Sequence, residues 1–313
     1  MAALFRYGLA LLLVLGLSTI RVAAEGQRVA LPDGRHLYLN CTGQGAPTVL
    51  LEGGYGADSG AWYQVQPVLA RTTRVCSYDR AGYGRSDAGP LPRDGRAVAK
   101  DLDQALRRAG IDGPFILVGH SIGALYVSLF ADLRPSDIAG MVLADPSVTH
   151  QNRRFASTFG PGAGGNPQHD EAQKCLAAAE KGLAPASDPT LAVCAADQKP
   201  ETLKNPLRVS QWRTLLSEAD TMFGATSDEV EAGRNIHGGV PLIVLTADGT
   251  YAGLPQPARQ AVSDFWMKLH AELAASSSSG SNRLVSHSSH MMMFDRPDAI
   301  CAAVMEIIGR ARK

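Results

Sequence analysis

The stretch "FILVGHSIGALYVSLF", residues 115–130, changes its hydrophobic period at a single serine. Its first four residues are all apolar, which is typical of a strand buried on both faces of a parallel sheet. After Ser121 the apolar residues are spaced as on one face of a helix. The sequence therefore predicts a turn from a strand into a helix, with Ser121 at the turn.

Two glycines flank this serine, so that Gly119, Ser121 and Gly123 form a G-x-S-x-G pattern. A sharp strand-to-helix turn lifts the serine hydroxyl off the sheet. The residues two positions away must then lack side chains, because the strand and the helix come very close together. Free N–H groups at the start of the helix also place partial positive charge beside the hydroxyl. The pattern and its position predict that Ser121 is a nucleophile.

Apolar strands alternate with helices along most of the chain. Such alternation indicates an α/β fold, with a mostly parallel sheet covered by helices on both faces. The expected strands cover residues 27–54 (three strands separated by turns), 73–79, 114–119, 138–146, 240–248 and 282–287, and the expected helices cover 96–111, 122–133, 256–276 and 297–312.

The alternation stops between residues 147 and 239, where helical stretches occur without a convincing strand. Because this segment interrupts the order of strands, we expect it to form a helical cap over the sheet. The core would then consist of residues 25–146 and 240–313.

The first 24 residues have the composition of a signal peptide. One charged residue, Arg6, precedes an uncharged run over residues 7–20, and small residues follow at Val22 and Ala24. The run is shorter than the roughly 20 residues that a membrane span needs. We therefore expect cleavage near Ala24 and a secreted or periplasmic protein, with no stable membrane insertion after cleavage.

Export permits disulfides, and the chain has five cysteines. Because five is odd, at least one thiol is free or pairs between chains. Cys175 and Cys194 flank a segment with a helix–turn–helix pattern, and we expect a disulfide between them. For Cys41 and Cys76, near two strand ends, a disulfide and two buried thiols are both open, and nothing indicates a partner for Cys301.

Charge and motifs exclude several functional classes. Basic and acidic residues both number 30, so no net charge attracts nucleic acid. The sequence contains no phosphate-binding or dinucleotide-binding motif, and no cysteine–histidine spacing suited to zinc. We expect a small-molecule substrate, no nucleic-acid partner, no metal and no cofactor.

A serine nucleophile needs a base, and the base needs an acid that orients it. His290 follows the last expected strand, from where its ring can reach across the sheet, and His287 is its rival. Asp248 ends the strand at 240–248 and is the preferred acid, and Ser121, Asp248 and His290 follow in the order usual for this motif. Asp145 has the same position at the end of the preceding strand and remains the alternative.

An oxyanion hole needs backbone N–H donors close to the nucleophile. The N–H of Ile122, the residue after the serine, is the first expected donor. The second is expected from the glycine-rich loop "LEGGYGADSGAW", residues 51–62, where Gly54 is the preferred residue.

Together these residues resemble the α/β-hydrolase superfamily over residues 27–146 and 240–312, with a cap inserted after the sixth strand. "YDRAGYGRSD" (78–87) resembles that family's turn after the fourth strand, and "SHMMMFDRPDAI" (289–300) resembles its histidine loop and final helix. One departure is visible: the family's usual His-Gly after the third strand is Glu52-Gly53 here, which places a carboxylate close to the site.

The resemblance implies a serine hydrolase that works through an acyl-enzyme intermediate. The balanced charge, without a basic cluster, favours a small or medium uncharged carboxylic ester as its substrate. An amidase or aminopeptidase, an acyltransferase and a secreted binding protein without catalysis are the alternatives. The substrate pocket is expected to be bordered by Tyr55, Trp62 and Met291 from the core and by Trp212 from the cap.

Overall fold

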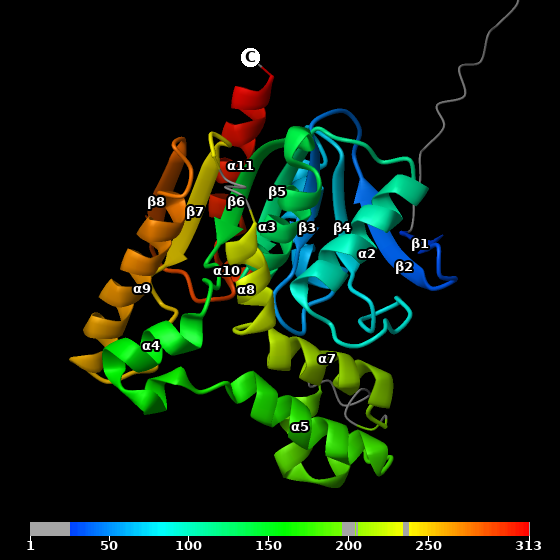
Figure 1. The fold of residues 1–313 in the computed structure, drawn as a ribbon, viewed down its shortest axis with the longest axis vertical. Helices are drawn as coiled ribbons and strands as arrows, with labels where there is room; N and C mark the ends of the chain where they lie inside the picture. Colours follow the sequence, from blue (N-terminus) through cyan, green and yellow to red (C-terminus); the bar gives the residue numbers. More distant parts are fainter. Residues whose placement is uncertain (1–25, 196–203, 205, 234–237, 313) are drawn as a thin grey trace, which may run out of the picture.

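A computed structural model of the chain describes residues 26–195, 204, 206–233 and 238–312. The expected signal peptide, residues 1–24, lies outside the described residues. Eight strands form one sheet in the order β1-β2-β4-β3-β5-β6-β7-β8 (Figure 1). The pairs β1–β2 and β2–β4 are antiparallel, and every other neighbouring pair is parallel. The predicted α/β fold with a mostly parallel sheet is confirmed.

The strands and the four longer core helices lie close to their expected ranges, and two short helices, α1 and α10, were not expected. The strands are β1 Gln27–Ala30, β2 His36–Thr42, β3 Thr48–Glu52, β4 Val75–Asp79, β5 Phe115–His120, β6 Ile138–Ala144, β7 Leu242–Ala247 and β8 Gly280–Val285. The core helices are α1 Gln66–Leu69, α2 Gly95–Arg108, α3 Gly123–Leu133, α9 Ala258–Ala274, α10 Met292–Asp295 and α11 Pro297–Ala311.

Both faces of the central strands are buried, which explains why β5 is apolar without interruption. Phe115 and Leu117 pack on one face in a cluster that includes residues of α2 and α3. Ile116 and Val118 point to the other face and pack in a cluster that includes residues of α11. Successive side chains of a strand point to opposite faces, so a strand covered on both sides needs an apolar residue at every position.

Helices fill the insert between β6 and β7. They are α4 Gln151–Phe159, α5 Pro167–Glu180, α7 Val209–Thr221 and α8 Ala225–Ala232, and the described residues of this insert contain no strand. In Figure 1, α4, α5 and α7 lie together beyond one end of the sheet. Among the described residues, no helix combines the length and the apolar character that crossing a bilayer requires.

Two disulfides are present, Cys41–Cys76 and Cys175–Cys194, and Cys301 is a buried free thiol. Cys41 and Cys76 are direct partners in the register of β2 and β4, which decides between the two alternatives that the sequence left open. The segment closed by Cys175–Cys194 differs from the expected helix–turn–helix: α5 is followed by short 3₁₀ turns that begin at Pro185 and Pro189. Disulfides of this kind are compatible with an exported protein.

The Cys175–Cys194 disulfide lies in the helical insert between β6 and β7, which is named the cap, and it should contribute measurably to stability. Closing a loop across a sequence separation of 19 residues restricts the unfolded chain by about 3 kcal/mol in the loop-entropy model. We expect the double variant Cys175→Ala/Cys194→Ala to lose about that free energy of unfolding in urea titrations. Cys301→Ala, which closes no loop, is the control. Equal losses in the two variants would mean that the cap bridge contributes only packing.

Candidate active site

Ser121 lies at the sharp turn between β5 and α3. Its φ of 53° is in the left-handed region, which is uncommon for residues other than glycine. A Cβ added at Gly119 would stand 2.8 Å from the Cα of Ala124. One added at Gly123 would stand 2.7 Å from the carbonyl oxygens of Glu52, the last residue of β3, and of Gly53. Both glycines are therefore required by close approach of backbone, as the sequence pattern predicts.

His290 and Asp145 form a hydrogen-bonded pair at this edge of the sheet. His290 lies in the loop after β8, and its Nδ1 is 2.7 Å from Oδ2 of Asp145, the residue that follows β6. An ionised carboxylate can only accept a hydrogen bond, so the Nδ1 of His290 carries the proton. In the neutral ring, Nε2 is then left with a free lone pair, which is the state that a general base requires.

The Asp145 carboxylate is completely buried and receives three further hydrogen bonds. Its donors are Thr250 Oγ1 at 2.6 Å, Trp266 Nε1 at 2.9 Å and the backbone N–H of Ala247 at 3.1 Å. Burial acts to raise the pKa of Asp145, but the bonds from His290 and Thr250 hold that pKa below its usual range. Asp145 is therefore a fixed negative charge beneath the imidazole.

The preference for Asp248 as the partner of His290 is wrong. Asp248 follows β7, but its two carboxylate oxygens accept hydrogen bonds from the backbone N–H groups of His287 and Ser288, at 3.0 and 3.1 Å. These bonds shape the loop after β8, so Asp248 acts as a turn former. His287, the rival base, has a φ of 58° in this turn, while the loop directs the ring of His290 to Asp145.

Two neutral histidines hold the backbone around this pair. Nε2 of His120 donates to the carbonyl oxygen of His290 at 2.8 Å, and the two rings lie 4.7 Å apart. His270 packs on Trp266 and donates from Nε2 to the carbonyl of Pro146 at 2.9 Å. Burial lowers the pKa of His120 to about 3 and that of His270 to about 4, so both stay uncharged at neutral pH.

Gly54 lies directly against the serine. A Cβ added at Gly54 would stand 3.2 Å from the Cβ of Ser121 and 2.8 Å from Nδ1 of His120. Only glycine therefore allows the loop after β3 to approach so closely. Ile122, the other expected oxyanion donor, follows the serine directly and lines the cavity into which Ser121 opens.

Ser121 and His290 open into one cavity of about 350 Å³ between the core and the cap. Aromatic and amide side chains predominate in its wall. The lining residues are Tyr55, Ser121, Ile122, Ser147, Gln151, Asn152, Phe155, Ala163, Gly165, Pro167, Gln168, Met222, Phe223, Thr250, Tyr251, Trp266 and His290.

Of the four pocket residues expected from sequence, only Tyr55 lines this cavity. Trp62 is buried in the apolar core beside α11, and Trp212 is buried inside the cap next to the Cys175–Cys194 disulfide. Met291 is partly exposed and is not among the residues of the wall. The sequence pattern did not indicate Phe155, Tyr251 or Trp266, because they come from separate elements that meet only in the folded chain.

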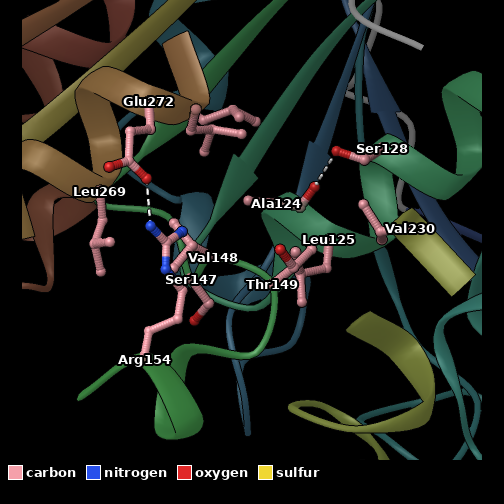
Figure 2. A pocket seen from close by; sticks show the side chains of 12 residues that line it. Ala124, Leu125, Ser128, Ser147, Val148, Thr149, Arg154, Val230, Leu269 and Glu272 are labelled. Carbon is pink, nitrogen blue, oxygen red and sulfur yellow. Dashed lines mark hydrogen bonds and ion pairs between the residues drawn. The ribbon is translucent and has the colours of Figure 1, made fainter. Parts of the chain in front are cut away.

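A second, smaller cavity of about 190 Å³ lies beside α3, the helix that follows Ser121, and shares Ser147 with the first cavity. Its wall includes Ser128 on α3 and Leu269 on α9, and Arg154 and Glu272 form an ion pair across it (Figure 2). Because these two charges pair with each other, none of the described residues in this wall presents an unpaired ionised group to a ligand.

The fold agrees with comparisons to known proteins. The model of the alpha/beta hydrolase fold family matches residues 47–219, which is more than half of the chain, and the protein belongs to this family. A thermophilic esterase from Thermogutta terrifontis superposes with a TM-score of 0.61 at 19% identity, covering 93% of this chain and 100% of that one. A putative epoxide hydrolase from Pseudomonas aeruginosa superposes with a TM-score of 0.62 at 22% identity, covering 92% and 97%.

Curated relatives match over shorter stretches. The uncharacterized protein YqjL of Bacillus subtilis is 34% identical over 106 residues, 34% of this chain and 42% of that protein. The putative carbamate hydrolase RutD of Klebsiella pneumoniae is 39% identical over 116 residues, 36% of this chain and 43% of that protein. The chain thus spans less than half the length of these two relatives.

Proposed function

We propose that the protein is a serine hydrolase that cleaves a small or medium uncharged carboxylic ester through an acyl-enzyme intermediate. The observation that carries this proposal is the bond between His290 Nδ1 and the buried Asp145, at the cavity into which Ser121 also opens. It supplies an oriented base and a fixed negative charge beside a strained serine, which is the arrangement that acyl transfer requires.

In the proposed reaction, the Ser121 hydroxyl attacks the ester carbonyl while Nε2 of His290 takes its proton. Asp145, with its lowered pKa, stabilises the positive charge that forms on the ring. The N–H groups of Gly54 and Ile122 bind the oxyanion, and His290 then protonates the leaving alcohol. Water, deprotonated by His290, attacks the acyl-enzyme, and the acid leaves as Ser121 recovers its proton.

The cavity wall supports an uncharged substrate. None of its described residues is an Asp, Glu, Lys or Arg, so an ionised group bound there would lose its hydration without gaining a partner of opposite charge. Phe155, Tyr251 and Trp266 provide apolar surface, and amides such as those of Gln151 and Gln168 provide hydrogen bonds. A volume of about 350 Å³ suits a small or medium ester.

We include export in this proposal. The two disulfides support it, because such bonds persist in oxidising compartments, and residues 1–24 would supply the cleaved signal peptide.

A paired screen tests the proposed activity. We expect the purified protein to hydrolyse p-nitrophenyl esters of short acyl chains faster than the matching anilides, and a fluorophosphonate probe to label Ser121. Carbamates belong in the panel because one relative is named a putative carbamate hydrolase. Faster cleavage of anilides or carbamates would replace the ester assignment, and transfer of the acyl group to an added alcohol in preference to water would indicate an acyltransferase. No turnover and no labelling would favour a binding protein.

A further inference from the structure

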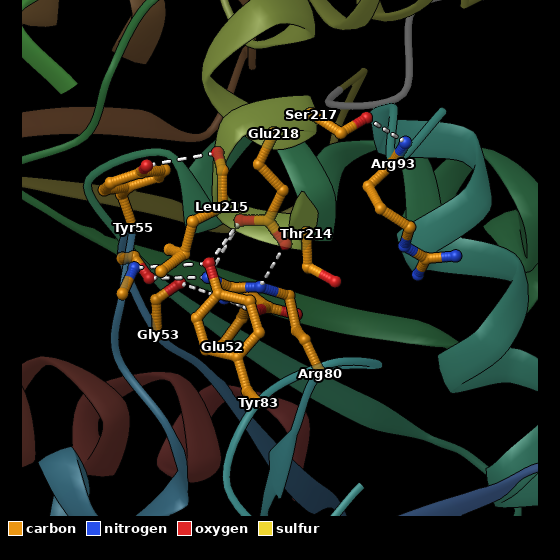
Figure 3. A network of polar contacts seen from close by, with 12 residues as sticks. Glu52, Gly53, Tyr55, Arg80, Tyr83, Arg93, Thr214, Leu215, Ser217 and Glu218 are labelled. Atoms are coloured by element: carbon orange, nitrogen blue, oxygen red, sulfur yellow. Dashed lines mark hydrogen bonds and ion pairs between the residues drawn. The ribbon is translucent and has the colours of Figure 1, made fainter. Parts of the chain in front are cut away.

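The carboxylate that departs from the family pattern belongs to a buried ionic cluster behind the oxyanion loop, which is the loop after β3, residues 53–58, and contains Gly54. Oε1 of Glu52 accepts from Nη1 of Arg80 at 2.7 Å, and its Oε2 accepts from the Tyr78 hydroxyl. The side chains of Glu52 and Arg80 are each 2% exposed or less. Figure 3 shows Arg80 at the centre of this cluster, between Glu52 and Glu218. Glu52 is thus a partner of Arg80 and does not face the substrate cavity.

Arg80 also binds the backbone of the oxyanion loop. Its Nη1 donates to the carbonyl of Gly53 at 2.8 Å, and its Nη2 donates to the carbonyl of Gly54 at 2.7 Å. In a trans peptide the C=O and the following N–H point in opposite directions. Holding the Gly53 carbonyl toward Arg80 therefore turns the Gly54 N–H to the other side of the peptide plane.

The cap supplies the other half of this cluster. Glu218 on α7 is fully buried, and its oxygens accept from Nε and Nη2 of Arg80 at 3.2 and 3.3 Å. The hydroxyl of Tyr83 donates to the same carboxylate at 2.7 Å, and the guanidinium lies 4.5 Å from the centre of the Tyr83 ring. Although burial acts to lower it, the pKa of Arg80 is raised by Glu218, Tyr83 and Glu52, so Arg80 stays charged.

We propose that Arg80 is a positioning residue that orients the Gly54 amide. Glu218 on the cap holds Arg80 in place, so the position of the cap on the core controls the geometry of the oxyanion loop. This inference rests on the proposed function only in assigning the Gly54 N–H to the oxyanion. A guanidinium is suited to this task because its planar donors can serve two carboxylates and two carbonyls at once.

The alternative is a purely structural fastening between cap and core, and kinetics separate the two. A positioning role affects the transition state more than the bound substrate, so kcat falls while KM changes little. We expect Arg80→Lys to lower kcat for p-nitrophenyl acetate by about 10²-fold, the loss typical of one oxyanion donor. The isosteric Glu218→Gln should lower it by about 10-fold, since Arg80 keeps its other partners.

Glu229→Gln is the matched control. Glu229 on the cap helix α8 accepts from the backbone N–H of Arg96 at 3.0 Å, so it also joins cap to core but does not reach the oxyanion loop. We expect its kcat and KM to equal those of the wild type. If Glu218→Gln and Glu229→Gln leave kcat equally unchanged, the positioning role is refuted.

A measurement without turnover keeps this inference separate from the proposed activity. Amide hydrogen exchange of residues 53–57 should accelerate in Glu218→Gln and stay unchanged in Glu229→Gln. If the wild type shows no turnover, the proposed function fails, and the exchange rates alone decide whether the cap holds the loop. Unchanged exchange in Glu218→Gln would overturn the inference. If Arg80→Lys does not fold, Glu218→Gln and Tyr83→Phe carry the same test.

Discussion

Replacing Ser121 with alanine is expected to lower kcat for a p-nitrophenyl ester by about 10⁶-fold, as the loss of a triad nucleophile does in other serine hydrolases. In the proposed reaction His290 is the base, and Asp145 fixes the direction of its ring. No second nucleophile in the cavity is therefore provided with an oriented base. Within the described residues the Ser121 hydroxyl makes no hydrogen bond that folding would lose. Alanine at this position has the same φ of 53° as serine and bears a similar backbone strain, so the thermal midpoint should change little.

Ser128→Ala is the control for this experiment. Ser128 lies further along the same helix, where its hydroxyl donates to the carbonyl of Ala124 at 2.8 Å, and it lines the second cavity. We expect this variant to retain wild-type kcat. Substantial turnover by Ser121→Ala, measured on protein whose circular dichroism matches the wild type, would show that another residue is the nucleophile.

Replacing Asp145 with asparagine is expected to lower kcat by about 10⁴-fold, whereas Asp248→Asn should lower it less than 10-fold. An amide at position 145 can offer an N–H to His290, which would favour the wrong ring tautomer and remove the charge that stabilises the imidazolium. The Asp248 carboxylate accepts hydrogen bonds from backbone N–H groups of the loop, and an asparagine oxygen can still accept from one of them.

The two variants are matched in chemistry and in position at the ends of adjacent strands. Asp145 has a φ of 42°, a left-handed conformation that asparagine tolerates well, so Asp145→Asn should fold. Comparing the kcat values of the two variants at a single pH is therefore sufficient to decide which aspartate supports His290. A 10⁴-fold loss confined to Asp248→Asn would mean that the loop after β8 rearranges when substrate binds and that the observed pair is not the catalytic one.

Much of the fold could be predicted because it depends on local signals. Continuous apolar runs predict strands that are buried on both faces, and each core strand lies close to its expected range. The turn at Ser121 is equally local, since Gly119 and Gly123 are needed by backbone atoms only a few residues away or on the adjacent strand. The position of Ser121, the proposed nucleophile, therefore follows from sequence pattern and steric exclusion.

The pocket and the ionic cluster depend on contacts between distant segments. Trp62 and Trp212 resemble pocket residues in sequence, but the sheet core and the cap core bury them. Phe155, Tyr251 and Trp266 line the cavity, and no periodicity relates them. Likewise, Glu52 is a departure from a family pattern in the sequence, and only the fold shows that it meets Arg80 and, through it, Glu218 on the cap.

The sequence by itself determined the parallel sheet, the strained serine turn and the position of His290 in the loop after the last strand. The choice between Asp145 and Asp248 was made only by the tertiary structure. Both residues follow strands that are neighbours in the sheet, so spacing along the chain does not distinguish them. The backbone N–H groups of the loop after β8 occupy Asp248, and the ring of His290 is thereby brought to Asp145, a packing outcome that depends on three segments at once.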